Sequence, residues 1–503
     1  MAEFDLKKIF DTNLQIIKCN VLAEVARLAF DNDFDYFRIS GIPEKVIQDD
    51  SPRVRCCVYK ERAIVSERVK LGLGGNKSDP TLVEVIDIAC DECPVDGIKV
   101  TDSCRGCIAH RCQSVCPRDA IEIVDTKARI DKSKCTECGL CMEVCQYSAI
   151  IRNVRPCVKS CPVKAISIDP VNHQKAIIDG SKCISCGQCV YQCPFGAISD
   201  KSFITDAIRI LRESEENTAY KVYAVVAPSV VSQYEAYPQI TIGMIFSGLL
   251  KLGFYRSVEA ALGADLTALN EAKELVEKGF LTSSCCPAFV NYIRSYVPGL
   301  KNDISHNLSP MAQISSVLKD QDPDCRIIFI GPCIAKKNEI TWSSVAPYVD
   351  CVLTFEEMQG MFLAKNINLL EMRDFNVRDA SGFGRGFARC GGLSDAVAQA
   401  IKEQHLADDG FELRGVMANG FDEVRRELLK AARDKKTNNF IEGMFCAGGC
   451  VGGPATLSHF GKKRRLVEKY SSAAGNREMI GAIRVLRTSS VPVSEAKEKE
   501  SMS

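Results

Sequence analysis

The chain contains 503 residues, with 64 lysines and arginines balanced by 64 aspartates and glutamates. No overall charge therefore favours binding to nucleic acid or to an anionic membrane surface, and the length is sufficient for about two to four domains. No stretch approaches the roughly 20 apolar residues of a membrane helix, and residues 1–10 mix acids with lysines rather than forming a secretion signal.

The composition is unusual in its high cysteine content, with 27 cysteines in the chain. In a short secreted protein such a number would indicate disulfides, but we find no secretion signal in this sequence. We therefore expect reduced thiols, available to bind metal in the cytoplasm.

Residues 1–85 carry few motifs, and their sequence indicates no role. Residues 14–30 have the apolar spacing of a helix, and residues 54–65 read as a strand that holds Cys56 and Cys57. Residues 72–76 are rich in glycine but match no complete phosphate-binding pattern, so we expect a turn there.

Residues 86–200 form a block in which cysteines recur with iron–sulfur spacing. The three runs with this spacing are Cys104, Cys107, Cys112 and Cys116; Cys135, Cys138, Cys141 and Cys145; and Cys183, Cys186, Cys189 and Cys193. A short apolar segment follows each run, which predicts a repeated ferredoxin-like unit of α+β type.

In bacterial two-cluster ferredoxins, the fourth cysteine of each run binds the other cluster. The same exchange predicts three [4Fe–4S] sites here, although the gap between Cys107 and Cys112 is longer than usual. The first site would consist of Cys104, Cys107, Cys112 and Cys145, the second of Cys116, Cys135, Cys138 and Cys141, and the third of Cys161, Cys183, Cys186 and Cys189.

The exchange leaves two cysteines of the block without a site, Cys157 and Cys193. Upstream, Cys90 and Cys93 supply two more thiols, so a fourth [4Fe–4S] site built from these four residues is a hypothesis. The alternative is that Cys90 and Cys93 are ordinary buried thiols or half of a zinc site.

Residues 201–475 change to an alternation of strands and helices. We expect a charged helix at 203–217, strands at 221–227 and 326–330, and helices at 269–278 and 395–402. This pattern predicts an α/β domain with parallel sheets flanked by helices, whose loops at the carboxyl ends of the strands form a site. Residues 476–503 form a tail that is polar from Ser489, where we expect disorder.

Three cysteine motifs lie far apart in this second half. They are residues 282–287, which read Thr-Ser-Ser-Cys-Cys-Pro; residues 331–337, which read Gly-Pro-Cys-Ile-Ala-Lys-Lys; and residues 444–453, which contain Cys446 and Cys450 among glycines. Two of them follow predicted strands, so all three can meet at one end of a sheet.

These motifs resemble the signatures of [FeFe]-hydrogenases, also called iron-only hydrogenases, and the cysteine block resembles the electron relay of their larger members. The resemblance covers about residues 86–470 and is closest to a clostridial-type subgroup whose motifs read Cys-Cys-Pro-Ala and Gly-Pro-Cys. It implies reversible interconversion of H2 with protons and electrons. The cofactor would be an H-cluster, a [4Fe–4S] cubane joined to a diiron subsite with CO, CN⁻ and azadithiolate ligands.

The resemblance also implies which residues hold this cofactor. Cys286, Cys333, Cys446 and Cys450 would bind the cubane, with Cys450 bridging to the diiron subsite. Lys336 would hydrogen-bond one cyanide. The residues near the second cyanide and the bridging region would be Ala227, Pro228, Ser229 and Met444.

For proton transfer the resemblance implies a path from Cys285 through Glu271 and Ser305 to Glu274, with Lys278 in place of an outer arginine. Glu271 and Glu274 are three residues apart and would share one face of a helix. A thiol at position 285 suits this role because it can both donate and accept a proton.

Three positions depart from the best-known members of the family: Met311 replaces a glutamine, Cys390 replaces a threonine, and residues 453–455 read Gly-Pro-Ala.

Two other functions stay open. One is a hydrogen-sensing regulatory protein with the same cofactor, and the other is an iron–sulfur assembly protein of a related branch. As partners we expect a soluble ferredoxin and the hydrogenase maturation proteins.

Overall fold

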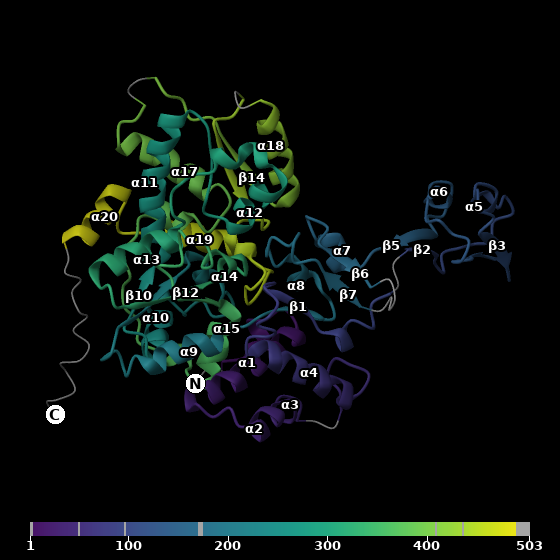
Figure 1. Ribbon diagram of the computed structural model, residues 1–503, viewed down its shortest axis with the longest axis horizontal. Helices are drawn as coiled ribbons and strands as arrows, with labels where there is room; N and C mark the ends of the chain where they lie inside the picture. Colours follow the sequence, from purple (N-terminus) through teal and green to yellow (C-terminus); the bar gives the residue numbers. More distant parts are fainter. Residues whose placement is uncertain are drawn as a thin grey trace.

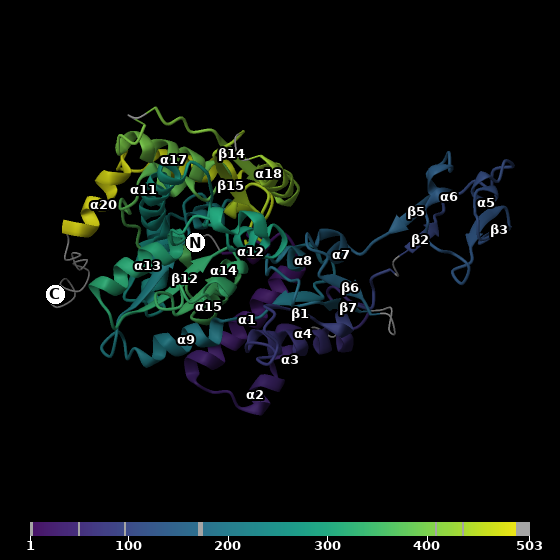
Figure 2. The same ribbon diagram turned by 45° about the horizontal axis from the view of Figure 1, so that its top comes forward.

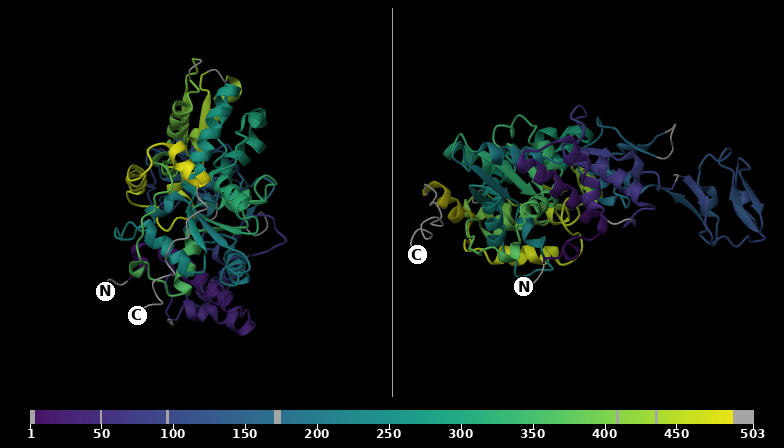
Figure 3. Two further views of the ribbon diagram at one scale, coloured as in Figure 1. Left: turned by 90° about the vertical axis from the view of Figure 1, so that its left-hand side faces the viewer. Right: turned by 90° about the horizontal axis from the view of Figure 1, so that it is seen from below.

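The computed structural model describes residues 4–48, 51–94, 97–169, 175–407, 410–434 and 437–488. A large α/β body contains the second half of the chain, and the N-terminal helices pack along one side of it (Figure 1). Residues 97–153, which we call the small lobe, extend away from this body (Figures 1 and 2, and the right-hand view of Figure 3). No helix in the described ranges is both long and apolar enough to cross a membrane.

A four-stranded parallel sheet forms the centre of the body, in the order β10-β9-β12-β13. These strands are Arg256–Glu259, Val222–Val226, Arg326–Gly331 and Cys351–Thr354. Every residue of β9 is buried, as expected for a parallel strand covered on both faces. The helices that contact this sheet are α9 (Ile204–Glu213), α10 (Ile242–Lys251), α13 (Pro310–Gln321), α14 (Ala335–Glu339) and α15 (Phe355–Ala364).

A second parallel sheet has the order β11-β15-β14, with strands Leu281–Thr282, Phe440–Met444 and Gly415–Asn419. The helices of this half are α11 (Ala260–Lys278), α12 (Pro287–Tyr296), α16 (Gly382–Gly386), α17 (Gly392–Glu403), α18 (Phe421–Arg433), α19 (Lys463–Ser472) and α20 (Met479–Thr488). The predicted α/β fold with parallel sheets is confirmed. The polar tail from Ser489 lies outside the described residues.

The cysteine block consists of short antiparallel strand pairs and short helices, and the predicted ferredoxin-like fold is confirmed. The pairs are β2 (Gly97–Val100) with β5 (Ile150–Asn153), β3 (Ile121–Val124) with β4 (Lys127–Ile130), β6 (Ile166–Ile168) with β7 (Ala176–Ile178), and β1 (Val83–Val85) with β8 (Ile198–Asp200). The helices are α5 (Arg111–Ser114), α6 (Leu140–Glu143), α7 (Pro156–Ser160) and α8 (Gln188–Gln192).

The N-terminal region is helical, with α1 (Asn13–Asp31), α2 (Tyr36–Ser40), α3 (Ile42–Val46) and α4 (Val58–Gly72). The strand predicted at residues 54–65 is therefore wrong. The Cys57 side chain accepts a hydrogen bond from the Lys60 nitrogen and caps α4, whose buried residues recur at helical spacing. The helix predicted at residues 14–30 is confirmed as α1, which packs against α15 and α9 of the body.

Candidate active site and cluster sites

Four cysteines from three distant loops meet at the carboxyl ends of strands. Cys286 lies between β11 and α12, Cys333 follows β12, and Cys446 and Cys450 follow β15. Burial raises the pKa of the Cys333 thiol, and Cys286 and Cys450 lie close enough to raise it further. The pKa of Cys446 is raised well above its ordinary value by burial and by the same neighbours. We call the space between these four thiols the central pocket.

A turn that requires glycine brings Cys450 to the central pocket. Gly448 and Gly449 have φ values of 85° and 92°. A Cβ at Gly449 would lie 2.6 Å from the Cys390 nitrogen, which itself donates to the Gly448 oxygen at 3.0 Å. Cys390 therefore packs its backbone against the turn that carries Cys450.

Lys336 lies at the edge of the central pocket and is buried. Its Nζ is 2.9 Å from Ser309 Oγ and 2.5 Å from Glu339 Oε2. Burial by itself would lower the pKa of Lys336, but Glu339, Cys333 and Cys285 raise it above its ordinary value. The ammonium therefore stays charged beside the four thiols, as a site for a compact anion needs.

The end of β9 lies next to the loop that carries Cys333. Ala227 donates its backbone N–H to the Ile330 oxygen at 2.9 Å, and its Cβ would be 3.3 Å from a side chain at Gly331. Pro228 and Ser229 follow in a short 3-10 helix, Pro228–Ser232. Ser229 Oγ is buried without a hydrogen-bond partner among the described residues, and Met444 is buried at the end of β15.

Cys285 and Glu271 form a buried pair beside the central pocket. Burial raises the pKa of the Cys285 thiol well above its ordinary value, with Glu271 as the next cause, so the thiol keeps its proton. Glu271 Oε1 accepts from the Ser284 nitrogen and hydroxyl, both at 3.3 Å. Burial raises the pKa of Glu271 to about 7.

A row of polar side chains continues from Glu271 to the surface. Ser305 lies close enough to Glu271 to lower its pKa, and it donates to Glu274 Oε2 at 3.3 Å. Glu274 Oε1 lies 2.6 Å from Lys278 Nζ and 2.9 Å from Nδ1 of His306, whose side chain is 75% exposed. The structure thus brings Cys285, Glu271, Ser305 and Glu274 close to one another between the central pocket and the surface.

Sequence reasoning missed three polar residues of this region. His306 contacts Glu274 at the surface, and Asn307 Nδ2 donates to Glu274 Oε2 at 2.7 Å. The sequence feature that could have identified His306 and Asn307 is their position directly after Ser305. Glu442 is fully buried on β15 and contributes to the raised pKa of Cys285, but its sequence context is that of an ordinary strand.

Residues 453–455, whose Gly-Pro-Ala sequence differs from that of the best-known [FeFe]-hydrogenases, contribute to packing around the central pocket. Ala455 donates its N–H to the Pro332 oxygen at 3.1 Å. A Cβ at Gly187, in the loop of the third site, would lie 2.8 Å from Pro454 Cγ. Met311, the third departure, is buried on α13.

The small lobe contains two cavities that match the predicted exchange of cysteines. One is lined by all four residues of the first site, Cys104, Cys107, Cys112 and Cys145. The other is lined by all four residues of the second site, Cys116, Cys135, Cys138 and Cys141.

The third and fourth sites lie in the body. Burial raises the pKa of Cys186 to about 12, and Cys183 and Cys161 contribute; Cys189 has the same neighbours. Burial likewise raises the pKa of Cys157 to about 12, with contributions from the three other thiols of the fourth site, Cys193, Cys90 and Cys93. The structure therefore gathers each predicted set of four.

Hydrogen bonds to sulfur recur in these sites and suit thiolates that bind iron. Four alanines donate their backbone N–H to the cysteine four residues before them, at 3.1–3.3 Å: Ala120 to Cys116, Ala149 to Cys145, Ala165 to Cys161 and Ala197 to Cys193. Within the described residues, no three His, Cys, Asp or Glu side chains converge on a point for one metal ion. The thiols of a cubane stand farther apart because each binds a different iron.

The central pocket adjoins the third site, and the third site adjoins the fourth. Gln188, between two cysteines of the third site, donates from Nε2 to Cys446 Sγ at 3.7 Å. Cys286 contributes to the raised pKa of Cys186, and Cys157 contributes to the raised pKa of Cys189. The central pocket, the third site and the fourth site therefore follow one another in space.

Comparison with known proteins gives a family for each part. Residues 220–454 match the C-terminal domain of the iron only hydrogenase large subunit, residues 154–197 a 4Fe-4S dicluster domain and residues 128–151 a 4Fe-4S binding domain.

Among individual proteins, the chain is 28% identical to iron hydrogenase 1 of Clostridium pasteurianum over 386 residues, which are 67% of this chain and 66% of that protein. It is 27% identical to the human nuclear prelamin A recognition factor over 270 residues, 41% of this chain and 57% of the relative. A variant of the [FeFe]-hydrogenase HydA1 from Chlamydomonas reinhardtii matches with a TM-score of 0.47 and 21% identity, over 57% of this chain and 94% of that one.

The chain spans 57–66% of the length of the first three curated relatives that it matches. Its cluster-binding block and its α/β body correspond to separate parts of one architecture, 4Fe-4S ferredoxin-type domains followed by the hydrogenase C-terminal domain. Residues 220–454 therefore belong with the iron-only hydrogenase large subunit family, and the chain shows distant homology, at 28% identity, to the clostridial iron hydrogenase.

Proposed function

We propose that this chain interconverts H2 with protons and electrons at an H-cluster in the central pocket, in the reducing cytoplasm. One observation carries the proposal. Four thiols, the charged Lys336 and the protonated Cys285 converge in a single buried place, although they come from three loops far apart in sequence.

The residues present fit such a cofactor. Cys286, Cys333, Cys446 and Cys450 would hold its cubane, and Lys336 offers a charged donor to an anionic ligand. Ser229 Oγ, buried without a partner in the described part of the chain, offers a second donor. When bound, the diiron subsite supplies the metal centre at which H2 is formed or split.

The chain's own residues would move the proton. Cys285 passes it between the central pocket and Glu271, whose pKa of about 7 suits a group that both accepts and donates near neutral pH. Glu271 Oε2 has no hydrogen-bond partner among the described residues, so it is available to take the proton. Ser305 and Glu274 continue the path to the surface beside Lys278.

Electrons would pass through four accessory [4Fe–4S] clusters in the order first or second site, fourth site, third site, central pocket. Their partner would be a soluble ferredoxin that docks on the small lobe. The exposure of Cys107, next to the 97% exposed Ile108, supports this docking place. Loading of the diiron subsite would require the hydrogenase maturation proteins.

Two alternative functions remain as rivals to this proposal. A hydrogen sensor of the same family would bind the cofactor with little turnover, and such relatives usually lose the thiol that Cys285 retains. An assembly protein would hold cubanes without a complete diiron site. The chain is 36% identical over 84 residues to the cytosolic Fe-S cluster assembly factor NAR1 of Kluyveromyces lactis, which makes this rival concrete.

The deciding experiment is a turnover assay of the full chain produced with hydrogenase maturation proteins, with reduced viologen as electron donor. We expect sustained H2 evolution. A loaded diiron subsite with no turnover would favour the sensor, and failure to load it beside a co-expressed known hydrogenase that does load would favour the assembly protein.

A further inference from the structure

Three buried arginines surround the fourth site, which consists of Cys90, Cys93, Cys157 and Cys193. Arg155 is 1% exposed, and its Nη1 donates to Cys90 Sγ at 3.5 Å. It belongs to the cysteine block, directly before α7. The other two arginines come from the N-terminal region, whose role the sequence did not indicate.

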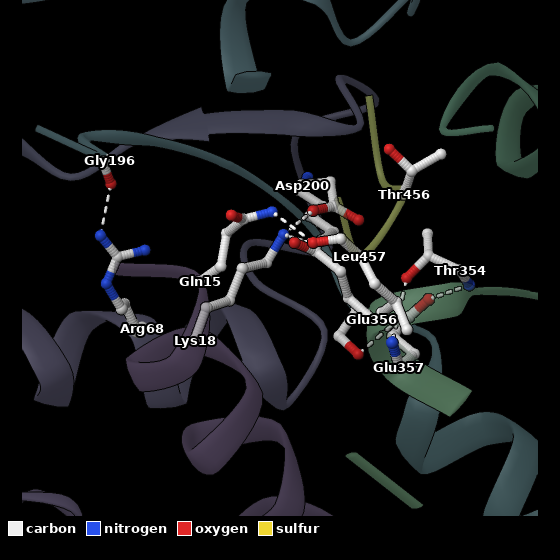
Figure 4. Close-up of polar contacts among 12 residues, drawn as sticks. Gln15, Lys18, Arg68, Gly196, Asp200, Thr354, Glu356, Glu357, Thr456 and Leu457 are labelled. Atoms are coloured by element: carbon white, nitrogen blue, oxygen red, sulfur yellow. Dashed lines mark hydrogen bonds and ion pairs between the residues drawn. The ribbon is translucent and has the colours of Figure 1, made fainter. Parts of the chain in front are cut away.

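Arg68 extends from α4 to the loop that follows Cys193. Its Nη2 donates to the Gly196 oxygen at 2.6 Å (Figure 4), and only 5% of the residue is exposed. Among the described residues, no carboxylate lies within ion-pair distance of its guanidinium. Burial lowers the pKa of Arg68 to about 10, while Cys193 and, more weakly, Glu356 favour its charge. The positive charge of Arg68 therefore lies beside the fourth site without a direct ion pair among the described residues.

Arg55 binds the two loops that flank the same site. Its Nη2 donates to the Phe195 oxygen at 2.7 Å and to the Ala89 oxygen at 3.4 Å, so it contacts residues next to Cys90 and Cys193. Glu92 lies 3.1 Å from Arg55 Nη1 and offsets part of this charge. The side chains around the fourth site nevertheless carry more positive than negative charge.

The N-terminal helices are fixed to both neighbouring domains, which holds these arginines in place. Lys18 on α1 pairs with Asp200 on β8 at 2.8 Å and with Glu356 on α15 at 2.6 Å. Gln15 Nε2 donates to the Leu457 oxygen at 3.2 Å, just beyond the loop of Cys450. Figure 4 shows Gln15 and Lys18 with these partners.

We propose that the N-terminal helices, through Arg68 and Arg55 and together with Arg155, raise the reduction potential of a [4Fe–4S] cluster in the fourth site above those of the two small-lobe clusters. The proposal rests on the proposed function in that it requires the fourth cluster to exist. Reduction adds one negative charge to the cluster, and a buried cation stabilises that charge because little water screens it. The basic side chains of the small lobe are more exposed, as with Lys127 at 53% and Arg152 at 42%.

The consequence is a role for residues 4–72. An electron that enters at the small lobe would move downhill to the fourth site and be held there, one step from the third site. The N-terminal region would thus set how the relay stores charge rather than bind a substrate.

The test is a redox titration of the full chain, followed by electron paramagnetic resonance, in the neutral variant Arg68→Met. The protein needs its cubanes only, so the diiron subsite and turnover do not enter the measurement. We expect one cluster to become at least tenfold harder to reduce, a shift of 59 mV or more to lower potential, while the others keep theirs. Arg155→Met should shift the same cluster, and Arg68→Lys should restore most of the potential.

Arg62→Met is the matched control, because Arg62 also lies on α4 but donates to the Ile47 oxygen, away from the cysteines. If Arg68→Met does not fold, Arg68→Gln and Arg155→Met provide the neutral variants. An unchanged potential in neutral variants that retain all five cubanes would overturn the electrostatic role. Iron analysis showing four cubanes in the wild type would overturn both this inference and the proposed four-cluster relay, whereas absent turnover with the expected shift would overturn the hydrogenase proposal alone.

Discussion

Gln188 donates from Nε2 to Cys446 Sγ at 3.7 Å, and this contact joins the third site to the central pocket. Gln188 lies between Cys186 and Cys189, so one residue links the loops of two neighbouring sites. A hydrogen bond to a sulfur that binds iron lowers the charge on that sulfur and so affects the potential of its cluster. The third site and the central pocket are therefore coupled where they meet.

Cys285→Ala should abolish most turnover without loss of the cofactor. The alanine has no proton to pass between the central pocket and Glu271, and loss of a positioned acid–base group costs about 100-fold or more. H2 evolution and the infrared spectrum of the same preparation measure the two properties. Cys390→Ala is the control, since Cys390 contacts the Cys450 turn through its backbone and should retain near-normal turnover. Full activity in the Cys285 variant would refute the assigned path.

Along the proton path, the loss of turnover caused by a substitution should become smaller from the interior to the surface. Glu271→Gln and Glu274→Gln remove groups that no other described residue replaces along the path, and we expect losses of about 100-fold. His306→Gln should cost less than about tenfold, because the 75% exposed imidazole sits where water can take its place. Turnover assays at saturating reductant measure the series, and a larger loss at His306 than at Glu271 would contradict the path.

Glu271 should make stability depend on pH. Burial raises its pKa from 4.5 to about 7, so the folded chain binds more protons than the unfolded chain between those pH values. The free energy of unfolding should therefore fall by about 3 kcal/mol as pH rises through this window, and then level off. Glu271→Gln should remove this dependence, whereas the exposed Glu277→Gln on the same helix should keep it. Unfolding midpoints at pH 5 and pH 8 compare the variants, and equal slopes in all three proteins would exclude the buried carboxyl as the cause.

The ion pairs of Lys18 should matter for stability. Lys18→Met leaves Glu356 buried and unpaired, and Asp200 keeps only Lys337, 2.9 Å away. We expect a loss of about 3 kcal/mol or more in the free energy of unfolding. The double variant Lys18→Met/Glu356→Gln should recover part of it, since no unpaired carboxylate remains. Denaturant unfolding measures the free energy of unfolding of the wild type and of both variants. A value for Lys18→Met within about 0.5 kcal/mol of the wild type would mean that water solvates this network.

Local spacing was enough to predict the fold class and the sets of cysteines. The exchange between runs depends only on the repeat, so the first and second sites follow from the positions of Cys116 and Cys145. The α/β body follows from alternating strands and helices. In the N-terminal region, the same reasoning misread the start of α4 as a strand, because Val58, Ile64 and Val65 are β-branched while the Cys57 cap is a weak signal.

Long-range electrostatics explain the rest of what the sequence left open. Lys337 is fully buried between Asp200 and Glu357, which are more than a hundred and about twenty residues away along the chain. Arg68 and Arg155 meet the fourth site from different domains. Such partners are set by the packing of whole elements, and no local pattern encodes them.

The infrared spectrum of the full chain, produced with hydrogenase maturation proteins, tests the central proposal most directly. Because Cys286, Cys333, Cys446 and Cys450 share one pocket with Lys336, we predict sharp CO and CN⁻ bands that disappear in Cys450→Ser. A spectrum without these bands, from a preparation in which the same maturation proteins load a known hydrogenase, would contradict the account.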